Sequence, residues 1–257
     1  MKNYIKDLKN NGFVILPKLF STLEINKAKK KLWDVIQGNY DTGIDPENRF
    51  WNIGDNPKNI IKIDKPHLCC NVLFKLITKR SFGHYLADLT NSKKVQIWHS
   101  QAVWKPARGG EKGNAGWHRD AQYWPFWNSK GLYTAWIALS DVKLDSGPVK
   151  FIEQSNKWEL LEKLDFFDKK ITDQEKIIKK YHNNIKIIYS TISKGQVSVH
   201  DSLTYHSSGP NKSRYPRIGL VVHFRTEKSR RKKTSKEYLK YLKQLKDYMR
   251  CPIIYDA

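Results

Sequence analysis

His118 and Asp120 lie two residues apart in the segment Trp117-His118-Arg119-Asp120, and both are residue types that bind metal ions. On a strand, residues i and i+2 project from the same face, so the imidazole and the carboxylate would converge on one point. His206, supplied from another strand, would complete a set of two histidines and one carboxylate. This set leaves positions open on a ferrous ion for a cosubstrate and for oxygen. His118, Asp120 and His206 are therefore the candidate ligands of a metal site, and iron(II) is an ion that this ligand set suits.

Arg217 follows His206 by eleven residues and has the group that binds a carboxylate through two parallel hydrogen bonds. A buried charge must be paired, so a carboxylate would be the partner of Arg217 if this side chain is buried. A metal-bound histidine usually donates its other N–H to a partner. His200 and Asp201 are candidates for that supporting role because they are close to His206 in sequence.

The same residues resemble the phytanoyl-CoA dioxygenase family of iron(II)/2-oxoglutarate oxygenases. The resemblance covers residues 8 to 225. The segments that carry it are Asn11-Gly12-Phe13-Val14-Ile15-Leu16-Pro17, Trp117 to Asp120, Trp136, Gly147-Pro148, Gly195-Gln196, and His206-Ser207-Ser208-Gly209-Pro210-Asn211-Lys212-Ser213 through to Arg217.

The resemblance implies that 2-oxoglutarate chelates the iron through its 1-carboxylate and keto oxygen. Its distal carboxylate would meet Arg217, with Ser208 as a hydrogen-bond donor, and Trp136 would line the same pocket. Reaction with O2 would then release succinate and CO2 and hydroxylate a substrate C–H bond. Related halogenases lack the carboxylate ligand, so Asp120 favours hydroxylation.

Composition and charge indicate a folded, strongly basic protein. The chain has 257 residues, a formal net charge of +22, 9 Trp, 13 Tyr and 10 Phe. Its length fits one large domain or two small ones, and its aromatic content excludes a disordered chain. The charge would attract anions. With Lys105, Arg119 and Lys150 near the site in sequence, we expect a small anionic substrate such as an acyl-CoA, a phosphonate, a phosphate ester or a carboxylic metabolite. Lys105 is also expected to help bind the cosubstrate. The charge could equally be only a solvated, lysine-rich surface.

The cysteines favour a reducing compartment. Cys69, Cys70 and Cys251 are three in number and have no paired spacing, which argues against a disulfide framework. The sequence has no apolar run long enough for a transmembrane helix and no signal-peptide core at its start. Cytoplasmic residence is therefore expected.

The pattern of elements predicts a mainly β fold with flanking helices. Short strands alternate with turns after residue 95, which indicates an antiparallel double-stranded β-helix, or jelly roll, of cupin type. Helices before residue 95 would support one sheet, and Ser21 and Glu24 form a predicted capping box. The expected helices are 3–10 and 22–37, with one or two more over 68–89. The expected strands are 13–16, 95–104, 132–139, 149–152, 185–189, 196–200 and 217–224. Residues 38–66 are expected to be loop, and 156–184 a charged helical insertion.

The domain prediction is a single jelly-roll domain over residues 1–225 followed by a basic helical tail over 226–257. Apolar residues recur in the tail at helical spacing, at Tyr238, Tyr241, Leu242, Leu245 and Met249. The helix could dock on the core, or contact nucleic acid, an anionic surface or a second subunit. Three functions stay open: an oxygenase, a non-catalytic jelly roll that binds polyanions through its tail, and a zinc hydrolase with the same three ligands.

Overall fold

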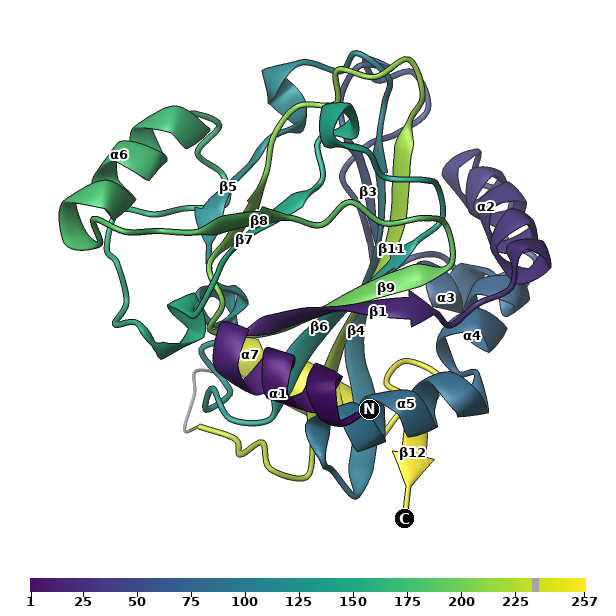
Figure 1. Ribbon diagram of the computed structural model, residues 1–257. Coiled ribbons are helices and arrows are strands. Elements are labelled where there is room, and N and C mark those ends of the chain that lie inside the picture. The colour runs from purple at the N-terminus through teal and green to yellow at the C-terminus, as the bar shows by residue number, and fades with distance from the viewer. Residues whose placement is uncertain (233–235) are drawn as a thin grey trace.

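Two antiparallel β-sheets face each other in the computed structural model, which describes residues 1–232 and 236–257 (Figure 1). The larger sheet has eight strands and the smaller has four. This arrangement confirms the predicted jelly roll. The predicted tail includes residues 233–235, which lie outside the described residues.

The major sheet has the strand order β1-β9-β6-β11-β4-β3-β2, and β12 adds to β4. Its long central strands β4 and β11 pair along ten residues of β11, which makes them the rigid middle of the sheet. The strands are β1 (Phe13–Lys18), β2 (Asn48–Arg49), β3 (Ile61–Asp64), β4 (Lys94–Lys105), β6 (Leu132–Ala138), β9 (Gln196–Asp201), β11 (Arg217–Thr226) and β12 (Ile253–Asp256).

The minor sheet has the order β5-β10-β7-β8. Its strands are short, and the chain leaves the sheet after each of them through loops and single helical turns. The strands are β5 (Ala115–His118), β7 (Val149–Ile152), β8 (Ile187–Tyr189) and β10 (His206–Ser208); the turns are η1 (Glu111–Gly113), η2 (Asp120–Tyr123), η3 (Leu144–Ser146) and η4 (Ser155–Lys157).

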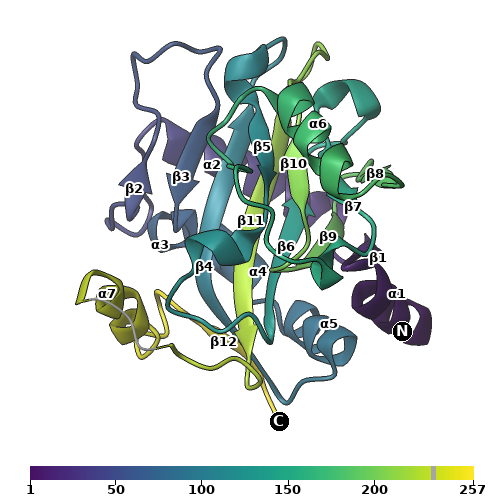
Figure 2. The same cartoon turned by 90° about the vertical axis from the view of Figure 1, so that its left-hand side faces the viewer.

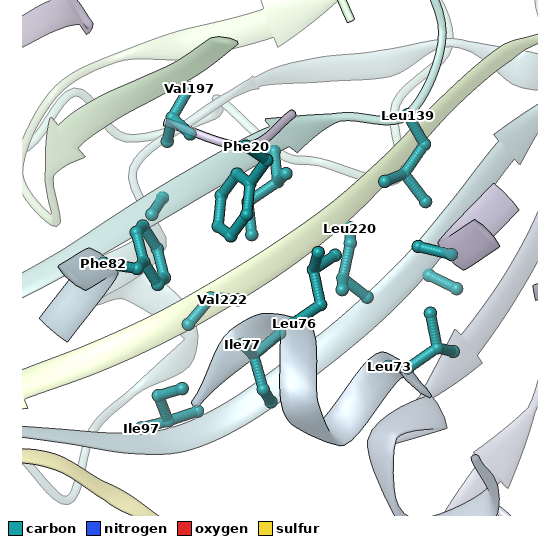
Figure 3. Packing of buried hydrophobic residues seen from close by; sticks show 14 of the residues in the cluster. Phe20, Leu73, Leu76, Ile77, Phe82, Ile97, Leu139, Val197, Leu220 and Val222 are labelled. Carbon is teal, nitrogen blue, oxygen red and sulfur yellow. The ribbon is translucent and has the colours of Figure 1, made fainter. Parts of the chain in front are cut away.

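The main hydrophobic core lies between the outer face of the major sheet and the N-terminal helices (Figure 3). Strand β11 shows how the two faces of the major sheet differ. Its even-numbered residues Ile218, Leu220, Val222 and Phe224 belong to this core. The odd-numbered residues therefore face the space between the two sheets. The helices are α1 (Lys2–Asn11), α2 (Thr22–Ile36), α3 (Pro66–Cys69), α4 (Asn71–Ile77), α5 (Arg80–Thr90), α6 (Ile171–Tyr181) and α7 (Lys236–Gln244).

The predicted start of the second helix is confirmed. The Ser21 side chain accepts a hydrogen bond from the Glu24 backbone N–H at 3.2 Å, and the Glu24 carboxylate accepts one from the Ser21 N–H at 2.7 Å. This capping box satisfies two backbone donors that the first turn of a helix leaves free.

The segment 38–66 was predicted to be loop, but it contains β2 and β3. Residues 61–64 pair with β4 over four residues. Such a short strand surrounded by turn-forming residues gives little local signal, because a partner distant in sequence stabilises it. Figure 2 shows β3 beside β4, so the major sheet extends further than the sequence indicated.

The insertion over 156–184 is less helical than expected, since α6 covers only residues 171–181. Its side chains nevertheless support the minor sheet. The buried Gln174 side chain accepts a hydrogen bond from the Trp117 backbone N–H at 2.6 Å, on the strand that ends at His118.

The predicted helical tail is helical only over 236–244 among its described residues. Thr226 still belongs to β11, and Ile253 to Asp256 form β12 beside β4. Helical periodicity cannot reveal such a return to the sheet, because strand pairing depends on a distant partner. Within the described ranges, every helix is too short or too polar to cross a bilayer.

Candidate metal centre

His118 and His206 are paired across neighbouring strands of the minor sheet. In each imidazole, Nδ1 lies close to a backbone carbonyl: Gly116 O at 2.8 Å for His118 and Thr204 O at 2.9 Å for His206. A carbonyl only accepts hydrogen bonds, so each Nδ1 carries the proton and donates it. Both Nε2 atoms therefore present lone pairs to the same space between the sheets, as metal ligation requires.

Asp120 lies at the start of η2, two residues beyond His118. Its Oδ1 is 3.8 Å from His118 Nε2 and 3.6 Å from His206 Nε2. One ligand atom from each of the three residues lies within 4.8 Å of the others, and all three residues are buried. The structure thus brings together the three side chains that the sequence singled out, although Asp120 projects from a helical turn and not from the strand itself.

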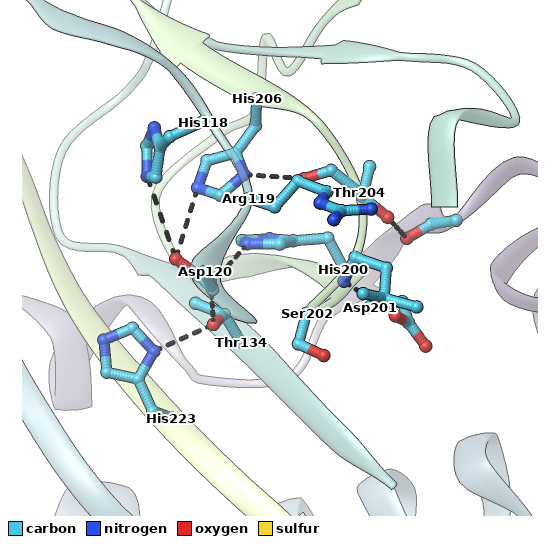
Figure 4. A network of polar contacts seen from close by, with 12 residues as sticks. His118, Arg119, Asp120, Thr134, His200, Asp201, Ser202, Thr204, His206 and His223 are labelled. Atoms are coloured by element: carbon cyan, nitrogen blue, oxygen red, sulfur yellow. Dashed lines mark hydrogen bonds and ion pairs between the residues drawn. The ribbon is translucent and has the colours of Figure 1, made fainter. Parts of the chain in front are cut away.

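The second oxygen of Asp120, Oδ2, is held by Thr134 and His200 (Figure 4). Oδ2 accepts hydrogen bonds from Thr134 Oγ1 at 2.5 Å and from His200 Nε2 at 3.1 Å. Because Thr134 gives its only proton to Asp120, His223 Nδ1–H donates to the Thr134 oxygen at 2.8 Å. These contacts leave Oδ1 as the oxygen directed at the centre.

The electrostatics keep the donor set ready to bind a cation. Burial lowers the pKa of His118, although Asp120 opposes this shift, and burial together with His118 lowers the pKa of His206 well below 6.5. Burial also opposes ionisation of Asp120, but His206 and the hydrogen bond from His200 hold its pKa well below 3.8. Two neutral imidazoles and one carboxylate are the protonation states that a divalent metal ion needs.

Two buried cations lie beside this donor set on the major sheet. Arg217 on β11 and Lys105 on β4 are directly paired, with exposures of 3% and 1%. Ser208 Oγ accepts hydrogen bonds from Arg217 Nη1 at 2.9 Å and from Lys105 Nζ at 2.7 Å. The other hydrogen bonds of these cations go to the carbonyls of Gly147 and Gly209.

No acidic side chain neutralises this pair within the described ranges. Burial lowers the pKa of Arg217 to about 10, and the pKa of Lys105 falls well below 10.5 through burial and through the charge of Arg217. Arg217 Nε is also buried without a hydrogen-bond partner. Uncompensated buried charge is costly, so the arrangement fits a ligand that brings its own carboxylate.

Trp136 completes this side of the cavity. Its ring lies 5.3 Å from the Arg217 guanidinium carbon, in cation–π contact. Gly219 makes the contact possible, because a Cβ at that position would lie 2.1 Å from Trp136 Cζ2. The structure therefore brings Lys105, Trp136, Ser208 and Arg217 to one end of the cavity. Ser208 was expected to donate to a carboxylate, but its hydroxyl donates to Gly147 O at 3.0 Å.

Four other residues that the sequence placed near the site have partners other than those expected. Arg119 donates to Trp158 O at 3.1 Å and Lys150 pairs with Glu175 at 2.8 Å, and neither lines the cavity. His200 contacts Asp120 and makes no hydrogen bond with His206. Backbone carbonyls hold Nδ1 of both candidate ligand histidines. Asp201 accepts a hydrogen bond from Leu203 N and makes none with His206.

One cavity of about 350 Å³ contains the donor set, the cation pair and a further region lined by aromatic rings. Several of its residues have no recognisable signal in the sequence. Thr134 and His223 carried no motif, and the lining residue Lys62 fell in a segment expected to be loop. Alternation along a strand could have placed His223 beside Arg217 on the inner face, six residues further along β11.

Comparisons with known proteins agree with this geometry. A model of the phytanoyl-CoA dioxygenase family matches residues 8–219. Similar solved structures include the non-heme α-ketoglutarate-dependent carbocyclase SnoK from nogalamycin biosynthesis (16% identity, 92% of this chain and 88% of that chain, TM-score 0.71). The epimerase SnoN from the same biosynthesis is 18% identical over 93% of this chain and 87% of that one, with a TM-score of 0.68. EctD from S. alaskensis, with 2-oxoglutarate and 5-hydroxyectoine, is 18% identical over 88% and 76%, with a TM-score of 0.68. No curated protein sequence matches the chain.

Proposed function

Because the chain belongs to the phytanoyl-CoA dioxygenase family and is an iron(II)/2-oxoglutarate-dependent oxygenase, we propose that it hydroxylates a small organic anion and releases succinate and CO2. The observation that carries the proposal is a pair of buried cations with only neutral partners, Lys105 and Arg217, in the same cavity as a His-Asp-His set. A diacid that also chelates a metal through its other end satisfies both features at once.

In this proposal His118, Asp120 and His206 hold the iron. The donor set fits the ion because two nitrogen lone pairs and the Oδ1 of Asp120 already face one point, and the protonated Nδ1 atoms are held by backbone carbonyls. When bound, the iron and its cosubstrate supply the oxidising power that the protein side chains lack. Thr134 and His200 orient Asp120 so that it offers one oxygen.

Arg217 and Lys105 would bind the distal carboxylate of 2-oxoglutarate, with Ser208 between them and Trp136 beside the diacid. An ammonium and a guanidinium attached to paired strands are held in place before the ligand arrives, which reduces the entropy lost on binding. The aromatic walls of the cavity would exclude water from the reacting centre. Three free, buried cysteines suit a reducing compartment such as the cytoplasm.

The test is iron-dependent conversion of 2-oxoglutarate to succinate, measured anaerobically and then with O2. We expect succinate release with iron(II), and its loss in His206→Ala and Arg217→Met. Arg214→Met is the matched control, since Arg214 is exposed and close in sequence. Succinate release that proceeds with zinc in place of iron, or that survives His206→Ala, would contradict the proposal.

A further inference from the structure

Lys62 faces the cavity from β3, a strand that alternates between two environments. Ile61 and Ile63 belong to the main core, whereas Lys62 and Asp64 line the cavity. The strand lies beside β4, which carries Lys105 and other cavity residues (Figure 2). Lys62 is therefore held by the sheet and does not belong to a surface loop.

Among the described residues, Lys62 differs from the other two Lys or Arg residues that line the cavity. Lys105 and Arg217 each have hydrogen-bonded partners. The Lys62 ammonium makes no hydrogen bond or ion pair within the part of the chain that the structure describes. It lies 4.7 Å from the centre of the Phe50 ring and 5.6 Å from that of Phe166. Burial lowers its pKa, and Asp64 and Asp120 only partly oppose this shift.

This ammonium is close to the reacting centre. The Phe166 ring beneath it also packs edge-on against His118, with 5.0 Å between the ring centres. The charge of Asp120 acts to raise the pKa of Lys62 against the effect of burial, and the charge of Lys62 adds to the burial that lowers the pKa of His223. A group bound by Lys62 would consequently lie in the same cavity as the candidate metal ligands, beside Phe166.

The acidic residues of the cavity already have partners. Asp64 accepts hydrogen bonds from Gln101 at 2.8 Å and Asn48 at 3.3 Å, and it lies 3.5 Å from His99 Nε2. Glu47 pairs with Lys65 at 2.9 Å and accepts a hydrogen bond from Gln244 at 2.9 Å. Neither carboxylate is free to bind a cationic substrate, while Lys62 is available for an anion.

A continuous row of aromatic rings leads away from the centre. The ring centre of Trp124 lies 5.0 Å from that of His223 and 4.9 Å from that of Trp98. The ring centres of Trp98 and Phe126 are 5.7 Å apart. Phe126 stacks on Tyr241 of α7 at 5.6 Å, and all these residues line the cavity. Flat unsaturated groups pack well against such surfaces.

We propose that Lys62 is the specificity-determining residue that binds the carboxylate of the substrate, and that an aromatic or unsaturated ring of that substrate lies against Trp98, Trp124 and Tyr241. This inference rests on the proposed function and names the substrate class. The cavity also has to hold 2-oxoglutarate, so its volume of about 350 Å³ suits a small aryl carboxylate and leaves no room inside for a nucleotide-sized carrier.

The experiment measures binding, not turnover, in anaerobic protein loaded with iron(II) and 2-oxoglutarate. The probes are two aryl carboxylates, 3-phenylpropionate and indole-3-acetate, each compared with its neutral primary amide by calorimetry. The variants are Lys62→Met and Lys62→Arg, and the control is Lys58→Met, an exposed lysine just before the same strand.

We expect at least one carboxylate to bind the wild-type protein about tenfold or more tightly than its amide. Lys62→Met should abolish this preference, while Lys62→Arg and Lys58→Met should keep it. Equal binding of acid and amide, no binding of either acid, or a preference that survives Lys62→Met would overturn the inference. Failure of the wild-type protein to bind metal or 2-oxoglutarate would instead overturn the proposed function, so the two failures are distinguishable.

Discussion

The hydroxyl of Thr134 donates a 2.5 Å hydrogen bond to Asp120 Oδ2, the carboxylate oxygen that faces away from His118 and His206. Thr134 is on β6 of the major sheet, whereas the two histidines are on the minor sheet. A single carboxylate thus links the two sheets, and its orientation depends on a residue distant in sequence from both histidines.

Replacing Thr134 with valine should weaken metal binding. Valine keeps the shape of threonine but cannot donate to Asp120, which would then be free to rotate. We expect the affinity for Mn(II), measured by calorimetry, to fall about ten- to hundredfold, as is usual when support for a metal ligand is lost. Thr134→Ser retains the donor and should stay close to wild type. Equal affinities of the valine and serine variants would count against this role of Thr134.

Lys105 should matter only for ligands with a distal carboxylate. We predict that Lys105→Met weakens binding of 2-oxoglutarate about tenfold or more, because one charge-assisted hydrogen bond is lost. Binding of 2-oxopentanoate, which lacks the second carboxylate, should change little. Calorimetric titration of both acids against the iron(II) protein checks this, and a parallel loss for both ligands would mean that Lys105 acts on the fold or the metal instead.

Acid should destabilise the protein through His67. This histidine is buried beside Ser100 Oγ at 2.7 Å, and burial lowers its pKa to about 3. Between pH 6.5 and pH 3 the unfolded chain binds a proton there that the folded chain does not, so stability falls as pH falls. The contribution is about 1.4 kcal/mol for each pH unit.

The measurement is the free energy of unfolding at pH 7.5 and pH 5.5, for the wild type and for His67→Gln. The variant removes one titrating group, so its stability should fall less steeply on acidification. His84→Gln is the control, because His84 is exposed. Identical slopes for the wild type and His67→Gln would show that His67 titrates alike in both states.

The basic tail should be needed for catalysis. Tyr241 of α7 lines the cavity, and Cys251 and Ile254 beyond it are buried. We predict that Tyr241→Ala lowers substrate-coupled turnover, whereas Tyr248→Ala, at a 61% exposed position, does not.

Removing residues 226–257 should also lower the thermal midpoint, because β12 and its contacts are lost. A truncated protein with full turnover would support a separate polyanion-binding tail.

The sequence identified the chemistry better than the surroundings of the site. His118, Asp120 and His206 could be selected because their types and spacing are constrained by what a metal ion needs. The major strands could be placed because their apolar residues alternate or run together. Lys62 could not be placed in this way, because β3 is a four-residue strand that depends on its pairing with β4. Tyr241 was placed on a helix correctly, but helical spacing does not reveal which cavity the helix covers.

Strand β11 carries both Arg217 and His223 and is hydrogen-bonded on each side, to β4 and β6. By contrast, Lys62, Phe166 and Tyr241 come from a marginal strand, an insertion and the C-terminal helix. In the proposed arrangement, mutations in these peripheral segments would change which molecule is accepted, while the central strand would preserve the reaction. The architecture would therefore let related enzymes differ in substrate while they keep the same oxidative chemistry.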